Sequence, residues 1–226
     1  MRLQSLFIVG ILMISTISVK AQKGFDVPHN LFSIKGGYAL TGFGKTNFSP
    51  WGKDYKSKLK GGPTFDANYS HLWVGESKQG GMGIGLLYSI VNTSANYSLN
   101  NLPVAVEDKI VLHYIAPQYV VVRKLGNRLL SGMSYGVGYM YYHNNGEKDG
   151  KSCVTNSSGL GFNVDFNLNY YVTPCFSVGV DVDVTCGVFN KLHRTFEGTK
   201  KSIDLNDDYK FNPSRADFML GLHYYF

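Results

Sequence analysis

Apolar and polar residues alternate one by one along much of this chain. From Leu160 to Tyr170, six large apolar residues occupy every second position, and Gly, Asn and Asp stand between them. The segment from Phe176 to Thr185 repeats the pattern, with four valines following Phe176. Because successive side chains of a strand point to opposite faces, each segment has one apolar and one polar face. The pattern therefore predicts β-strands and does not fit helical spacing.

Eight segments of this kind predict eight strands. They cover residues 31–43, 62–73, 82–94, 110–123, 129–142, 159–171, 175–189 and 214–226. The connections alternate in length. Long polar segments occupy 44–61, 95–109, 143–158 and 190–213, and short turns occupy 74–81, 124–128 and 172–174. Long loops on one side and tight turns on the other predict an antiparallel up-and-down barrel with both termini at the turn side.

An eight-stranded barrel can be a water-soluble protein of the lipocalin kind or a membrane protein. A water-facing surface would carry about a quarter or more charged residues, but the whole chain has 17% charged and 14% aromatic residues. Its strands set Gly, Ser, Asn and single Asp residues against large apolar ones, which suits a narrow interior and a lipid-facing exterior. The lipocalin alternative also lacks a Gly-x-Trp near the start of the barrel, since Trp51 lies in a predicted loop. We therefore predict an all-β transmembrane barrel.

The first 21 residues have the layout of a secretory signal peptide. Arg2 precedes the apolar run LFIVGILMI (6–14), and Val19 and Ala21 flank Lys20 before the predicted cut. This predicts a signal peptide at 1–21 and a barrel domain at 22–226. Removing Arg2 and Lys20 leaves 20 basic and 16 acidic residues, a net charge of +4.

The last predicted strand ends the chain on an aromatic residue. Its alternate positions hold Phe218, Leu220, Leu222, Tyr224 and Phe226. This strand resembles the terminal strand of outer-membrane barrels, whose final aromatic residue serves as a signal for the insertion machinery. With its alternating loop lengths and signal peptide, the mature chain resembles the small outer-membrane β-barrel family of Gram-negative bacteria, the OmpA/OmpX-like proteins. The resemblance implies an integral outer-membrane protein, the insertion machinery as a partner, and a monomer.

Seven charged residues take the polar parity and are predicted to point into the barrel. They are Lys35, Asp66, Asp165, Asp181, Asp183, Arg215 and Asp217. Asp181 and Asp183 share one face about 7 Å apart, given a rise of ~3.3 Å per residue. Buried charges must pair or lose hydration at high cost, which favours a structural network with Asp183 or Asp217 beside Arg215. The alternative is a wet lumen around Lys35, Asp66 and Asp181 that passes ions or small solutes.

Seven glycines bear on the choice between a filled lumen and a water-filled one. Glycines at lumen parity could leave gaps for water and favour a narrow channel. They are Gly83, Gly85, Gly132, Gly136, Gly138, Gly161 and Gly179.

Pro117 cannot donate a ladder hydrogen bond and predicts a bulge or irregularity within 110–123, so the inward face of that strand is left unassigned.

Aromatic residues predict two belts at the membrane interfaces. The belt at the turn side comprises Phe32, Trp73, Tyr170, Phe176, Tyr224 and Phe226. The belt at the loop side comprises Tyr97, Tyr139, Tyr141, Phe162, Phe189 and Phe218. For individual residues, packing among strand faces is the alternative.

Residue patterns typical of catalysis or of metal and cofactor sites are missing. The six histidines are dispersed, with no His-x-x-His or His-Glu-x-x-His spacing, and no nucleophile is spaced to meet a base. We therefore predict no enzyme activity, metal or cofactor. Of three cysteines, Cys153 and Cys186 share the loop side, so they are either a disulfide or free thiols; Cys175 lies at the opposite end.

The first long loop is basic and aromatic. Its lysines are Lys45, Lys53, Lys56, Lys58 and Lys60, opposed there by Asp54. Outside a cell the expected anion is a lipopolysaccharide phosphate rather than nucleic acid; a merely solvated loop is the alternative.

Taken together, these features favour a structural or surface-interaction protein with a largely filled lumen. A narrow channel or small-solute binder is the second hypothesis, and a lipid-modifying enzyme the third.

Overall fold

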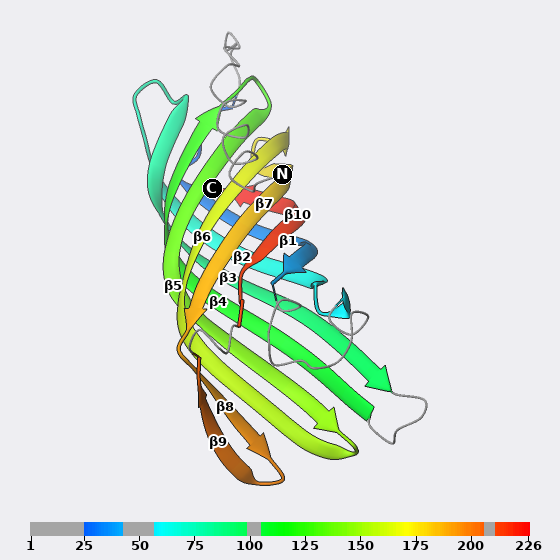
Figure 1. Ribbon diagram of the computed structural model, residues 1–226. Coiled ribbons are helices and arrows are strands. Elements are labelled where there is room, and N and C mark those ends of the chain that lie inside the picture. The colour runs from blue at the N-terminus through cyan, green and yellow to red at the C-terminus, as the bar shows by residue number, and fades with distance from the viewer. Residues whose placement is uncertain (1–24, 43–56, 99–104, 206–210) are drawn as a thin grey trace, which may run out of the picture.

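The computed structural model describes residues 25–42, 57–98, 105–205 and 211–226, which form ten antiparallel strands. They are β1 (Asn30–Thr41), β2 (Gly61–Val74), β3 (Gly80–Ser98), β4 (Ala105–Lys124), β5 (Leu129–Lys148), β6 (Lys151–Thr173), β7 (Phe176–Phe189), β8 (Lys191–Phe196), β9 (Thr199–Asp204) and β10 (Arg215–Tyr225). Strands β1 to β7 and β10 close a ring, because β10 pairs with both β7 and β1 and β5 pairs with β6 (Figure 1). Closure leaves no unpaired ring edge, as an all-strand membrane span requires. In the described chain, no helix is long and apolar enough to cross a membrane.

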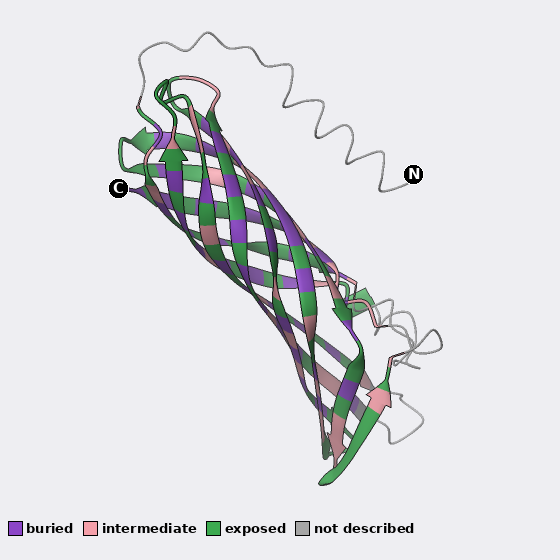
Figure 2. Cartoon of the chain, turned by 90° about the vertical axis from the view of Figure 1, so that its left-hand side faces the viewer, coloured by how far each residue is buried: buried purple, intermediate pink, exposed green. Residues whose placement is uncertain are grey.

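The predicted barrel topology is confirmed. The short turns β2–β3, β4–β5 and β6–β7 lie at one end of the ring together with the C-terminus (Figure 1). At the opposite end β3 to β6 continue as a one-sided sheet, and β8 and β9 extend it (Figures 1 and 2). We call these the turn end and the hairpin end. The predicted signal peptide lies outside the described residues and stays a prediction.

Three of the predicted loops are wrong in part, because they contain strands. Much of 95–109 belongs to β3 and β4, most of 143–158 belongs to β5 and β6, and 190–213 contains β8 and β9. At the hairpin end, outward positions such as Asn92 and Asn96 are exposed, while Ala95 is buried. The alternation persists there with its polarity reversed, so the sequence resembles a polar loop.

Burial alternates along the ring strands (Figure 2), and the exposed face is apolar. Large exposed apolar side chains come from all eight ring strands and, among described residues, from neither β8 nor β9. On β6 they run from Leu160 to Val172. At ~3.3 Å per residue and a tilt of ~40°, that stretch covers roughly 30 Å of height, the thickness of a bilayer's hydrocarbon core. This exterior is a lipid-facing belt.

Pro117 interrupts one ladder without shifting its register. Pairing between β4 and β5 passes from Ile115–Tyr139 to Gln118–Gly136 at unchanged register, while Pro117 itself stays opposite Leu86 on β3. The predicted irregularity is therefore a gap in one ladder and no bulge. The inward face of β4, which the sequence left open, carries Tyr114 and Gln118 among other buried residues.

Candidate functional site

The barrel interior is the candidate site, and it is filled in three layers. The layer nearest the turns is apolar, and we call it the turn-end cluster. It comprises Val27, Leu31, Leu72, Val120, Val122, Leu130, Tyr171 and Tyr225, with Phe25 and Val74 packed against it. Residues before β1 contribute to it: Phe25 lies 5.6 Å from Tyr171 between ring centroids, and Val27 is buried. The chain entering β1 thus closes this end of the lumen.

The layer at the opposite end is also apolar, and we call it the hairpin-end cluster. Its members are Leu59, Leu87, Ala95, Val106, Ile110, Leu112, Tyr114, Ala116, Met140, Tyr142, Phe189 and Leu192, with Tyr97, Ile203, Leu205 and Phe211 packed against it. Leu59 precedes β2 and Phe211 precedes β10, so segments outside the ring also cover this mouth. Phe211 stands edge-on to Tyr142, with centroids 4.8 Å apart. Apolar side chains therefore flank the polar interior at both ends.

Between the two clusters lies the charged layer, and all seven sequence-predicted charged residues are buried in it. Lys35 Nζ on β1 lies 2.7 Å from Asp165 Oδ2 on β6 and 2.7 Å from Asp181 Oδ1 on β7. Arg215 Nε lies 3.1 Å from Asp217 Oδ2 on the same strand. Of the two partners expected for Arg215, the structure selects Asp217. These pairs compensate the loss of hydration that burial imposes on each charge.

Three of the carboxylates face each other directly across strands. Asp183 on β7 is paired with Asp165 on β6 and with Asp217 on β10. Like charges in opposed positions destabilise a sheet unless other groups compensate. Asp183 accepts hydrogen bonds from Asn163 Nδ2 at 2.6 Å and from Thr185 Oγ1 at 2.5 Å. Donors placed around each carboxylate thus hold the row together.

Neutral polar residues that the sequence analysis did not single out extend these contacts around the charged residues. Asn163 Oδ1 accepts from Tyr114 at 3.2 Å, and Asn68 donates to Gln118 at 2.6 Å. Ser89 links Arg215 to Asp66, because it accepts from the guanidinium and donates to the carboxylate. The strand parity of these residues was the one signal that could have found them.

His223 on β10 is another member that the sequence analysis did not place in the lumen. It is 1% exposed, and its Nε2 lies 3.7 Å from Asp181 Oδ2. The described lumen holds the carboxylates of five aspartates and two cations, Lys35 and Arg215, so acidic groups outnumber basic ones there. Its position between Leu222 and Tyr224 gives His223 the inward parity, but only the ring brings β10 beside Asp181 on β7.

Neighbouring side chains occupy the space beside most of the lumen glycines, and backbone lies against Gly83 and Gly138. A Cβ at Gly161 would lie 2.7 Å from the Tyr114 ring. A Cβ at Gly136 would collide with the Asn163 amide oxygen, and one at Gly179 with that of Asn169. An interior cavity beside Lys35 measures about 10 Å³, room for about one water molecule. These glycines therefore allow close packing of side chains and strands around the lumen.

The two aromatic belts are present in a corrected form. All six residues of the turn-side belt are exposed on the exterior, as are Tyr139, Phe162 and Phe218 of the loop-side belt. Tyr97 and Phe189 were wrongly assigned to the exterior, since both pack in the hairpin-end cluster. Their strands reverse polarity beyond the lipid-facing belt, so an inward ring there is shielded from water.

A row of aromatic, histidine and amide side chains crosses the exterior just beyond the lipid-facing belt. Tyr88 OH lies 2.9 Å from His113 Nδ1, and His113 and Tyr141 have ring centroids 6.2 Å apart. Tyr141 stacks on His143 at 6.5 Å, and His143 Nδ1 lies 2.6 Å from Asn156 Oδ1. Amphipathic rings at this level suit the headgroup region of a membrane.

Beyond the belt, one carboxyl group is enclosed within the hairpin end. Burial raises the pKa of Asp108, while the hydrogen bond that Asn144 donates at 2.7 Å and the charge of Arg194 act in the opposite direction. Burial also raises the pKa of the neighbouring Tyr142 phenol. These polar groups lie on the inner face of the extended sheet.

The three cysteines are free thiols, so the possible disulfide between Cys153 and Cys186 is wrong. Cys186 on β7 is paired with Phe162 of β6, whereas Cys153 lies nine residues earlier on β6. At ~3.3 Å per residue, that separation is about 30 Å, far beyond disulfide reach. Cys175 is exposed at the turn end.

The basic loop is only partly described. Lys58 and Lys60 are exposed before β2, and Lys58 Nζ donates to the carbonyl of Asn96 at 3.4 Å. Lys45, Lys53 and Lys56 lie outside the described residues. The predicted contact with anionic lipid stays a prediction.

Comparison with known proteins gives the fold a context. No protein-family model and no curated protein matches the sequence. Neisserial surface protein A (NspA) matches in structure at 10% identity and TM-score 0.52, covering 88% of this chain and 97% of that one. A major outer membrane protein from Thermus thermophilus matches at 15% identity and TM-score 0.58, covering 87% and 99%. OprG from Pseudomonas aeruginosa matches at 13% and 0.51, covering 90% and 99%.

This chain has the fold of a small outer-membrane β-barrel. The ring of eight strands and the lipid-facing belt agree with that assignment, so the predicted fold class and integral outer-membrane architecture are confirmed. At these identities the matches bear on fold and not on activity. The expected absence of enzyme activity therefore stays a prediction, as does the monomeric state.

Proposed function

We propose that this outer-membrane barrel has a structural and surface-interaction role, with a closed lumen and a sheet that projects outside the cell. The packing of the lumen carries the proposal: apolar clusters at both ends enclose a hydrogen-bonded charged layer. A solute path would need a continuous wet passage, and the interior cavity beside Lys35 has room for about one water molecule. The projecting sheet of β3 to β6, β8 and β9 is the surface for partners.

The closed-lumen proposal predicts that the reconstituted barrel gives no discrete openings in a planar lipid bilayer. The matched variant combines Tyr114→Ala with Tyr171→Ala, which removes one large ring from each apolar cluster. That variant is expected to leak measurably more than the parent under the same voltage. Steady discrete openings of the parent itself would overturn the proposal and favour the narrow channel.

We also propose that the basic segment before β2 contacts lipopolysaccharide phosphates. Lys58 and Lys60 are exposed there, and a basic residue near an anionic surface contributes about 1 kcal/mol. Lys58→Ser combined with Lys60→Ser should lower co-purified lipopolysaccharide several-fold at low salt, with the difference shrinking at 1 M salt. Lys200→Ser combined with Lys201→Ser on β9 is the matched control. Equal retention by both double variants would contradict a specific role for this segment.

A further inference from the structure

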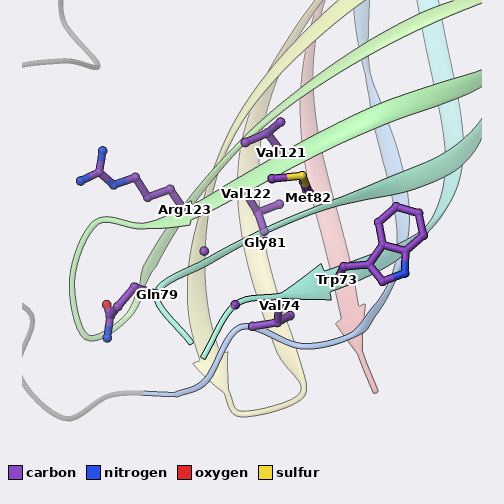
Figure 3. Close-up of a pocket in the computed structure, with 10 residues that line it drawn as sticks. Trp73, Val74, Gln79, Gly81, Met82, Val121, Val122 and Arg123 are labelled. Atoms are coloured by element: carbon purple, nitrogen blue, oxygen red, sulfur yellow. The ribbon is translucent and has the colours of Figure 1, made fainter. Parts of the chain in front are cut away.

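A groove interrupts the lipid-facing exterior at the turn end. The ends of β2, β3 and β4 line an open, shallow depression of about 560 Å³, with Trp73, Met82 and Val121 on its apolar side (Figure 3). Trp73 and Met82 are each 54% exposed. Gly80 has the outward parity of Met82 and adds no side chain to this surface beside Arg123. The volume of the groove lies within the ~300–1,000 Å³ usual for ligand pockets.

The end of this groove toward the turns is polar. Arg123, the second-to-last residue of β4, and Gln79 of the β2–β3 turn both line it, and Arg123 extends away from the apolar wall (Figure 3). In the described part of the chain, no carboxylate lies within 4.0 Å of the Arg123 guanidinium. The neighbouring cations have partners: Lys78 Nζ lies 2.9 Å from Asp26, and Lys124 donates to the carbonyl of Phe25. Arg123 is thus an unneutralised cation at the mouth of an apolar groove.

We propose that this groove binds one glycerophospholipid of the periplasmic leaflet. An acyl chain lies along Trp73, Met82 and Val121, and the phosphate faces Arg123 with the Gln79 amide beside it. A guanidinium offers a planar fork of donors that matches phosphate, and its long stem can lie on apolar surface while the charge stays at the interface. Trp73 at the same rim suits the headgroup boundary. The inference rests on the proposed outer-membrane orientation, which places the turn end at the periplasmic leaflet.

A second exterior groove provides an internal comparison. Leu168, Val178, Val180, Leu220 and Leu222 line about 530 Å³ between β6, β7 and β10, without a charged residue among the groups that form it. Tyr170, at its edge, already accepts a hydrogen bond from Arg128 Nη1 at 3.3 Å. This groove can contact acyl chains, and the nearby cation Arg128 reaches its edge through the Tyr170 hydroxyl. The two grooves thus differ in that a charged side chain, Arg123, lines the first and none lines the second.

Native mass spectrometry of the folded barrel in non-ionic detergent, with added dioleoyl phosphatidylglycerol, tests the proposal. The parent should retain one phospholipid, and Arg123→Gln should weaken retention about tenfold, as expected for loss of one charge-assisted contact. Val121→Trp, which fills the groove, should abolish the adduct. Val180→Trp, which fills the second groove, should leave it unchanged. Diacylglycerol, which lacks the phosphate, should be retained no better by the parent than by Arg123→Gln.

Equal phosphatidylglycerol retention by the parent and Arg123→Gln would overturn the proposal, as would an adduct lost in Val180→Trp but kept in Val121→Trp.

A second measurement uses inserted protein carrying Trp51→Phe, so that Trp73 is its one tryptophan. Vesicles contain a small fraction of brominated phosphatidylglycerol. Quenching of Trp73 should exceed that expected from the mole fraction, and Arg123→Gln should remove the excess. Heat-modifiable gel mobility reports barrel insertion independently, so failure of the barrel is distinguished from failure of the groove.

Discussion

Replacing Lys35 by Met is expected to destabilise the folded barrel by about 3–5 kcal/mol, the cost of breaking a buried ion pair by removing one partner. Lys35 Nζ lies 2.7 Å from both Asp165 and Asp181, and all three side chains are at most 6% exposed. Without the ammonium group, two carboxylates remain buried near Asp183 and no cation separates them. The measurement is urea unfolding in lipid vesicles, followed by the mobility difference between folded and boiled protein.

Two further variants make this result specific. Lys78→Met removes the lysine of an ion pair of similar length, 2.9 Å, whose side chains are 61% and 62% exposed. Because exposed pairs contribute little, this change should barely move the unfolding midpoint. Adding Asp165→Asn and Asp181→Asn to Lys35→Met should restore much of the lost stability. If Lys35→Met unfolds like the parent, the charged layer does not stabilise the fold.

The second large effect is expected on the lipid-facing side of β10. Leu220 is 71% exposed and lies between Gly36 of β1 and Val180 of β7. An Arg or Lys at the membrane midplane costs about 2–4 kcal/mol and an Asp less, which still opposes insertion. Leu220→Asp should therefore sharply lower the heat-modifiable fraction in membranes. Asn167→Ser, on the lumen face, should be tolerated. Asn167 donates to Asp165 and accepts from Asn169, each at 3.0 Å, and such bonds contribute about 1 kcal/mol each.

Removing Phe226 tests the same strand at its end. Phe226 N–H donates to the Asn30 carbonyl, and Asn30 N–H donates to the Phe226 carbonyl, each at 3.1 Å. The deletion removes this closing pair and the ring stacked 5.5 Å from Tyr224. Insertion should fall in this variant as well.

The membrane assignment would be wrong if the Leu220→Asp protein folded as efficiently as the parent and fractionated with soluble periplasmic proteins.

Much of the barrel could be predicted from local pattern. Alternation along β6 and β10 assigned each residue to one face, because a strand's side chains alternate whatever the strand packs against. The same parity placed Lys35 and Asp183 inside and Leu220 outside, as the structure has them. The alternation gave wrong predictions where the surroundings of the strands change from lipid to water. Beyond the lipid-facing belt, Ala95 and Tyr97 face inward and polar residues face water, so strands resembled loops.

The sequence by itself determined the faces of most ring strands, the ring topology and seven charged residues of the lumen. Only the tertiary structure decided which of those charges pair, because Lys35 on β1 reaches Asp165 and Asp181 across a closed barrel, far away along the chain. It also decided that the lumen glycines are filled, since the group that occupies the space at Gly179 is Asn169 of the adjacent strand. The groove at Arg123 required the ends of three strands to be placed together. The face to which a side chain points is a property of one strand. The pairing of charges, the filling of space beside glycines and the grooves depend on distances between strands, and the closure of the ring sets those distances.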